Sequence, residues 1–151
     1  MPLKYPTRLS DAIHILCFII LADETQPLTS AAIAKSIHTN PSYVRQLMSL
    51  LRKAGLLTSV RGHARPALTH TPEDITLRDC YRAICGDEPL LHQDTHTNPE
   101  CGVGVNIQLA LRDCYDIVQH AAEEEMGRIT LKEILDRYHE RAAVWQEMAA
   151  K

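Results

Sequence analysis

A short amphipathic helix with clear signals at both ends is the strongest structural feature of this sequence. Asn40 followed by Pro41 is a typical helix start, because asparagine caps free N–H groups and proline at the first helical position has no N–H to lose. Gly55 stands where a left-handed residue commonly follows a helix. Between these signals, apolar residues recur at three- and four-residue spacing: Val44, Leu47, Met48 and Leu51. The sequence therefore predicts a helix from Pro41 to about Ala54 with one buried face.

Two more helices are predicted before this one, and a hairpin after it. The first helix has an apolar stripe made of Leu9, Ala12, Ile13, Leu16, Cys17 and Ile20. The second, capped by Thr29 or Ser30, carries Ala31, Ile33, Ala34 and Ile37. After Gly55, short apolar segments flank the basic turn Arg-Gly-His-Ala-Arg-Pro at 61–66, a pattern that favours a small β-hairpin. Three short helices and a basic hairpin outline a winged helix-turn-helix.

The second half of the chain is expected to be helical as well. Thr-Leu-Arg-Asp at 76–79 is a capping box for a fourth helix, and residues 86–104 form a loop rich in Pro, Asp, His, Asn and Gly. A long helix is predicted from Val105 to about Met126, and a last helix from Thr130 towards Trp145. We expect a mainly α fold with a small β-hairpin wing (α+β), divided into a DNA-binding domain (1–85), a loop (86–104) and a dimerisation helix with a C-terminal helix (105–151).

Charge is distributed unevenly over the 151 residues. Residues 1–70 carry a formal charge of +5 and residues 71–151 carry −8, although the whole chain has only −3. Such asymmetry suggests that the first half meets a polyanion, with two separately solvated surfaces as the alternative. No run of about 18 apolar residues and no signal-peptide pattern is present, so we expect a cytoplasmic protein without a membrane partner.

The predicted third helix and hairpin carry residue types that suit duplex DNA. A recognition helix enters the major groove and a wing grips the adjacent backbone. Arg45 can donate two hydrogen bonds to guanine and Gln46 can bind adenine, whereas Lys35 and the other cations match phosphates. Solvation of helices and a turn is the alternative explanation for each residue taken singly. The expected DNA contacts are Thr29, Ser30, Asn40, Ser42, Tyr43, Arg45, Gln46, Ser49, Arg52, Lys53, Arg61, His63 and Arg65.

The predicted long helix has a seam that suits self-association. Its apolar residues alternate spacings of three and four, as in paired helices: Ile107, Ala110, Leu111, Cys114, Ile117, Val118, Ala121 and Ala122. These residues have no large apolar partner unless the first and last helices cover them. We expect a homodimer interface at Ile107, Leu111, Cys114, Val118 and Ala121, and therefore a palindromic operator.

Ordered motifs along nearly the whole chain resemble the Rrf2 family of bacterial transcriptional regulators, and most of all its YwnA-like branch. They are Leu-Thr-Ser at 28–30, Ile-Ala at 33–34, Thr-Asn-Pro at 39–41, Val-Arg-Gln-Leu-Met at 44–48, Leu-Leu-Arg-Lys-Ala-Gly-Leu at 50–56, Pro-Glu-Asp-Ile-Thr-Leu at 72–77, Tyr-Arg-Ala-Ile at 81–84, Asn-Pro at 98–99 before Cys101, Val-Gly at 103–104, Asn-Ile-Gln at 106–108 and Leu111. The resemblance implies a winged-helix homodimer with a long crossing helix, which usually represses promoters.

Two departures from the family pattern matter. Family wings usually carry a run of glycines after Arg-Gly, but this chain has Gly-His-Ala-Arg-Pro-Ala at 62–67. Members that bind a cluster place three cysteines in the loop before the long helix, whereas this loop has only Cys101. With two of the three thiolate ligands missing, we expect no cofactor and no conventional iron–sulfur cluster.

The sequence leaves open which signal the protein senses and whether it has another function. Cys101, next to the start of the long helix, is a candidate redox or electrophile sensor, or an unreactive residue packed in the loop. His92, His96 and Cys101 are weak candidates for a metal site. The other thiols, Cys17, Cys80 and Cys114, are expected in the core.

No Gly-x-Ser-x-Gly, phosphate loop or His-Glu-x-x-His motif occurs in the sequence, so we expect that the protein is not an enzyme. The alternative function is a regulator-like module that binds a protein partner through its acidic helical half.

Overall fold

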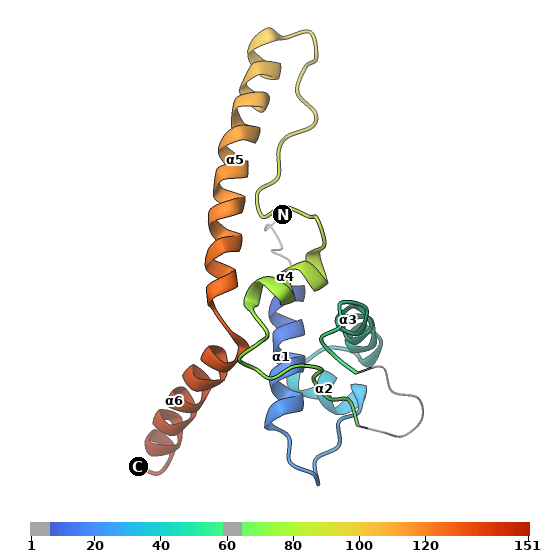
Figure 1. Ribbon diagram of the computed structural model, residues 1–151, viewed down its shortest axis with the longest axis vertical. Coiled ribbons are helices and arrows are strands. Elements are labelled where there is room, and N and C mark those ends of the chain that lie inside the picture. Colours follow the sequence, from blue (N-terminus) through green and yellow to red (C-terminus); the bar gives the residue numbers. More distant parts are fainter. Residues whose placement is uncertain (1–6, 59–64) are drawn as a thin grey trace.

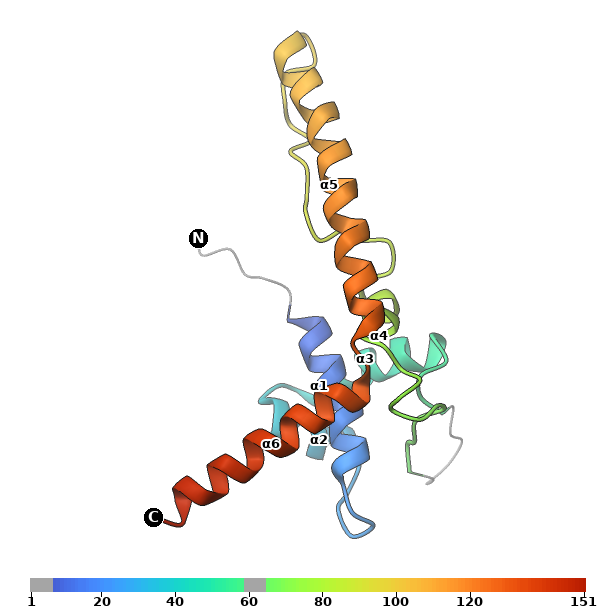
Figure 2. The same ribbon diagram turned by 60° about the vertical axis from the view of Figure 1, so that its left-hand side comes forward.

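The computed structural model describes residues 7–58 and 65–151, which form a mainly helical fold (Figure 1). The helices are α1 (Arg8–Leu21), α2 (Ser30–Ile37), α3 (Pro41–Lys53), α4 (Leu77–Cys85), α5 (Gly102–Arg128) and α6 (Leu131–Ala149). Helices α1 to α4 pack together as one domain, and α5 rises from this domain as a long arm (Figures 1 and 2). Among the described residues, no helix has the length and apolarity needed to cross a membrane.

The core forms where the first four helices meet. Its fully buried side chains come from every helix of the domain, from the chain that joins them and from the start of α6: Ile15, Leu16, Ile33, Val44, Leu47, Leu51, Leu57, Ile75, Cys80 and Leu131. The inner face predicted for α3 is confirmed in full. On α1 the predicted stripe was incomplete, because Ile15 and Ile19 are buried while Ile13 and Cys17 are only half-buried. Helix α1 packs against α2, α3 and α4, which widens its buried face.

The predicted starts of α2, α3 and α4 agree with the structure. The Thr29 and Asn40 side chains accept hydrogen bonds from the N–H groups of Ala32 and Tyr43, at 3.1 and 2.9 Å. Thr76 and Asp79 form the expected reciprocal capping box of α4. Gly55 has φ +76°, in the left-handed region that favours glycine. These local signals therefore fix the limits of α2, α3 and α4.

Helix α5 begins earlier than predicted, and none of its residues is buried within the single chain. It starts at Gly102 rather than Val105, with Cys101 at the N-cap. Glycines at 102 and 104 lower helix propensity, but the hydrogen bond from the Val105 N–H to the Cys101 carbonyl continues the helical pattern. Cys114 was expected in the core and is exposed instead, because no other part of the described chain covers its face of α5.

The apolar residues of α5 leave a stripe uncovered along the arm. Positions 103, 107, 110, 114, 117 and 121 follow one another at spacings of four and three, and all six side chains are exposed. Ile117 is 70% exposed and Ile107 is 50% exposed. Leu111 lies off this stripe and is half-buried. The loop of residues 86–101 runs along α5 (Figures 1 and 2). An exposed apolar stripe along a 27-residue helix is typical of helices that pack against an apolar partner.

A short antiparallel contact ties the junction of α5 and α6 to the domain. The Leu77 N–H donates to the Ile129 carbonyl at 2.8 Å, and the Leu131 N–H donates to the Ile75 carbonyl at 2.7 Å. This pairing places the starts of α4 and α6 side by side, at the bridge between Thr76 and Thr130. Local sequence patterns gave no sign of it, because the two segments lie more than fifty residues apart.

The predicted hairpin wing is described only at its base, which we define as residues 56–58 and 65–69. Leu57 and Leu68 form an antiparallel bridge, and the Thr58 N–H donates to the Ala67 carbonyl at 2.9 Å. These residues form an isolated bridge and not regular strands, and residues 59–64 lie outside the described part of the chain. The structure therefore supports a mainly helical fold, and a complete β-hairpin wing stays a prediction.

Candidate nucleic-acid interface

Helix α3 separates a buried apolar face from an exposed polar one. The polar face carries four of the predicted DNA contacts, namely Ser42, Arg45, Gln46 and Ser49, and all four side chains are exposed. Burial of Val44 and Leu47 against α1 and α2 fixes the rotation of the helix and therefore the direction of this face. The structure brings together on one surface the side chains that could reach the edges of bases.

Arg45 is held in place by two hydroxyl groups. Its Nη1 donates to Ser30 Oγ at 3.2 Å and its Nη2 donates to Ser42 Oγ at 2.9 Å. Ser30 begins α2 and Ser42 belongs to the first turn of α3, so the guanidinium spans the two helices of the helix-turn-helix. Both serines were expected to contact DNA themselves. In the structure they orient the guanidinium, and whether they also touch DNA stays a prediction.

Tyr43 contacts the protein itself. Its hydroxyl donates to Asp11 Oδ2 at 2.9 Å, which ties α3 to the N-terminal turns of α1. Burial raises the pKa of Tyr43, and the hydrogen bond to Asp11 raises it further. The tyrosine hydroxyl therefore remains protonated and stabilises the angle between α1 and α3. The expected contact of Tyr43 with DNA is not tested by this geometry.

Thr29 and Asn40, also expected at the interface, cap the two helices of the motif. Asn40→Ala should lower the free energy of unfolding by about 0.5–2 kcal/mol, because the Tyr43 N–H loses its partner. Urea denaturation monitored by circular dichroism measures this change. Asn40→Asp is the matched control, since its carboxylate caps equally well and should preserve stability while weakening DNA binding. Equal stability of Asn40→Ala and the parent would contradict the capping role.

Two of the predicted phosphate contacts donate hydrogen bonds to backbone carbonyls, and their contact with DNA stays a prediction. Arg52 Nε donates to the Thr58 carbonyl at 3.2 Å, and the guanidinium of Arg65 donates to three carbonyls between α1 and α2. Lys53 is exposed at the last turn of α3. Arg61 and His63 lie outside the described residues. Arg52 and Arg65 therefore have structural partners that their sequence context did not indicate.

The loop of residues 86–101 carries the remaining candidates. His92, His96 and Cys101 are all exposed, and the backbone N–H of His96 donates to Asp94 Oδ1 at 2.8 Å. Over residues 7–58 and 65–151, no three His, Cys, Asp or Glu side chains come close enough together to hold a metal ion. The described donors therefore do not fit an iron ion or cluster.

The five thiols differ in their surroundings. Burial raises the pKa of Cys17 to about 11 and that of Cys80 to about 12, and it also raises the pKa of Cys85. These three thiols are therefore protonated and poor nucleophiles at neutral pH. Cys101 and Cys114, on the arm, are the exposed ones.

Hydrogen bonds that the sequence did not indicate connect the loop of residues 86–101 to α5 and to the domain. Gln119 of α5 accepts from the Leu90 N–H at 2.9 Å and donates to the Tyr81 hydroxyl at 3.1 Å. The Tyr81 hydroxyl in turn donates to the Glu88 carbonyl at 2.6 Å. Arg82 and Glu123 form a salt bridge of 2.8 Å beside it. A polar residue on an exposed helix gives no sequence signal for such a role.

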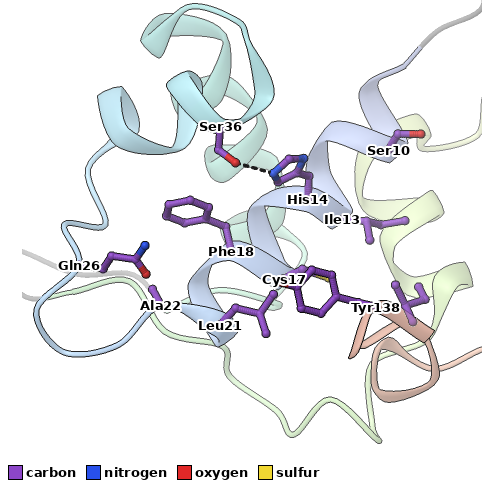
Figure 3. A pocket seen from close by; sticks show the side chains of 11 residues that line it. Ser10, Ile13, His14, Cys17, Phe18, Leu21, Ala22, Gln26, Ser36 and Tyr138 are labelled. Atoms are coloured by element: carbon purple, nitrogen blue, oxygen red, sulfur yellow. Dashed lines mark hydrogen bonds between the residues drawn. The ribbon is translucent and has the colours of Figure 1, made fainter. Parts of the chain in front are cut away.

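A groove of about 580 Å³ lies between α1 and the start of α6 (Figure 3). Ile13, Cys17, Phe18 and Tyr138 give it apolar walls, and His14 forms a hydrogen bond of 2.8 Å with Ser36 at one side. No residue of α3 lines this groove. The groove is thus separate from the exposed face of α3.

Comparison with known proteins agrees with the helix-turn-helix geometry. Residues 5–137 match the model of the Rrf2 family, described as iron-dependent transcriptional regulators. YwnA of Bacillus subtilis strain 168, named as an HTH-type transcriptional regulator, is 41% identical over 130 residues, which cover 86% of this chain and 96% of YwnA.

Solved structures give the same result. One crystal structure, of a protein described as DNA-binding, has a TM-score of 0.67 and 41% identity, and the match covers 85% of this chain and 98% of that one. T. potens IscR has a TM-score of 0.65 and 26% identity, with 93% and 92% of the two chains covered. Both similarities extend over the arm as well as the domain.

Proposed function

The chain belongs to the Rrf2 family of DNA-binding transcriptional regulators, and on that premise we propose that it is a homodimeric repressor of a palindromic operator in the cytoplasm. The observation that carries the proposal is the exposed face of α3, where Arg45 is oriented by Ser30 and Ser42 beside the exposed Gln46. In this proposal Arg45 and Gln46 contact bases, and the surrounding hydroxyls and cations contact phosphates.

The uncovered stripe of α5 supports the dimeric part of the proposal. Two copies of the arm packed along this stripe would bury side chains that the single chain leaves in water. A two-fold dimer presents two copies of α3 to successive turns of the major groove, which requires a palindromic site.

Selection of bound sequences from a random duplex library tests the proposal directly. We expect the purified protein to enrich one palindrome whose half-sites lie about one helical turn apart. Enrichment of a single half-site would contradict the dimer, and no enrichment would contradict sequence-specific binding.

The alternative is a module that acts mainly through a protein partner. The acidic second half of the chain, with a formal charge of −8, favours it. Retention on heparin at low salt separates the two functions. A DNA-binding regulator should be retained and elute as salt rises, whereas a protein adaptor should pass through.

We further propose that the loop of residues 86–101 receives the signal, with Cys101 as a thiol sensor. Treatment with a mild disulfide reagent should change operator affinity by about 5- to 150-fold in the parent protein, which is the usual range of allosteric coupling. Cys101→Ser should not respond, and Cys114→Ser, which removes the other exposed thiol, should respond like the parent. Fluorescence anisotropy of labelled operator measures the effect. Equal responses in the parent and Cys101→Ser would leave a small molecule, a metal or constitutive repression as the explanation.

A further inference from the structure

Arg65 joins the wing base to the rest of the domain by three hydrogen bonds. Its Nη1 donates to the Gln26 carbonyl at 2.7 Å and to the Glu24 carbonyl at 3.3 Å. Its Nη2 donates to the Asp23 carbonyl at 2.9 Å. One guanidinium thus joins the wing base to the turn between α1 and α2, some forty residues earlier in the chain.

Hydrogen bonds to the side chain of Asp23 stabilise the turn between α1 and α2. Asp23 Oδ1 accepts hydrogen bonds from the N–H groups of Thr25 and Gln26, at 2.8 and 3.0 Å, and from the Thr25 hydroxyl at 2.5 Å. Hydrogen bonds from Thr25, with a smaller contribution from the charge of Arg65, lower the pKa of Asp23. An aspartate that binds N–H groups two and three residues ahead folds the backbone into a tight turn, and here the carbonyls of that turn face Arg65.

The other side of the wing base is tied to the recognition helix. Arg52 of α3 donates to the Thr58 carbonyl, and Thr58 in turn pairs with Ala67. The wing base is therefore held from both sides, by α3 through Arg52 and by the α1–α2 turn through Arg65.

We infer that Arg65 is a positioning residue, which fixes the wing base against the Asp23 turn, and not a phosphate contact. Its N–H groups are directed at three carbonyls, and a guanidinium can satisfy several fixed acceptors in a way that a lysine ammonium cannot. This inference rests on the proposed DNA-binding function, because the wing base is held in a fixed position so that the protein can bind DNA.

Two substitutions at Arg65 separate positioning from a charge contact. Arg65→Ala and Arg65→Lys should both weaken operator binding about three- to tenfold, the usual cost of ordering one more side chain on binding. The slope of log Kd against log salt should stay unchanged in both. Retained affinity in Arg65→Lys, with a slope shallower by about one in Arg65→Ala, would overturn the inference in favour of a phosphate contact.

Substitutions at Asp23 distinguish positioning from charge, because the two explanations predict opposite changes in DNA affinity. Asp23→Ala removes a negative charge, which alone would favour DNA binding. If Arg65 acts by positioning, Asp23→Ala should instead weaken binding as much as Arg65→Ala, and the double variant should be no weaker than either. Asp23→Asn loses the same charge but keeps an oxygen that accepts the same hydrogen bonds, so it should bind at least as tightly as the parent. Tighter binding by Asp23→Ala, or additive losses, would overturn the inference.

Amide hydrogen exchange tests the connection without DNA. Arg65→Ala should speed exchange of the Gln26 amide, and Asp23→Ala should speed exchange of the Thr58 amide on the other side of the contact. Thermal unfolding should show that both variants stay folded at the temperature of the binding assay. If the parent selects no operator but these exchange effects appear, the proposed function fails while the link between wing base and turn stands. Unchanged exchange in both variants would overturn the link itself.

Discussion

Ile117→Glu should convert the dimer to a monomer and weaken binding to the full operator by about 100-fold or more, because two linked half-sites bind far more tightly than one. Ile117 is 70% exposed in the single chain, so a glutamate there costs the folded monomer little. In the proposed dimer the same position lies within the stripe of α5, where a charge would be buried without a partner. Sedimentation velocity and operator titration measure the two effects.

The matched control is Leu109→Glu. Leu109 is 48% exposed on the same helix, but its position is turned away from the stripe formed by 103, 107, 110, 114, 117 and 121. The same chemical change there should leave the dimer and the DNA affinity intact. If Ile117→Glu stays dimeric, or if both variants dissociate alike, the interface lies elsewhere.

Features that depend on neighbouring residues were predictable from the sequence. The caps at Thr29, Asn40 and Thr76 were predictable because each side chain bonds an N–H group three residues ahead. The left-handed conformation at Gly55 was predictable because glycine adopts it without strain at the end of a helix. Such signals need no knowledge of the tertiary fold. They fix the starts of α2, α3 and α4, and the apolar spacing within α3 predicts which of its faces is exposed.

Features that depend on distant segments were not predictable. The sequence predicts a phosphate contact for Arg65, which the structure does not test, and nothing local indicates that its guanidinium binds the carbonyls of the Asp23 turn. The hydrogen bonds of Gln119 and the pairing of residues 75–77 with 129–131 were not predictable for the same reason, because their partners lie far away in the sequence. Cys114 was misplaced for a different reason. An apolar stripe on a helix indicates burial but does not say whether the partner belongs to the same chain.

Arg45→Ala should weaken binding to the selected operator by about 1–3 kcal/mol, or about 5- to 150-fold in Kd, and relax the preference at one position in each half-site. Arg45 is exposed on α3, and its guanidinium is already oriented by Ser30 and Ser42, so little ordering is needed when it meets a guanine.

The control for charge alone is Arg45→Lys, which keeps the cation but cannot form a two-pronged contact with guanine. We expect Arg45→Lys to lose the base preference as Arg45→Ala does, while its salt dependence stays close to that of the parent. Ser42→Ala removes the 2.9 Å hydrogen bond that orients the guanidinium, and it should give a smaller loss at the same base position. Titration of each variant against the operator and its single-base substitutions measures all three effects. Binding of Arg45→Ala to the operator with the parent's affinity would show that α3 does not place Arg45 against a base.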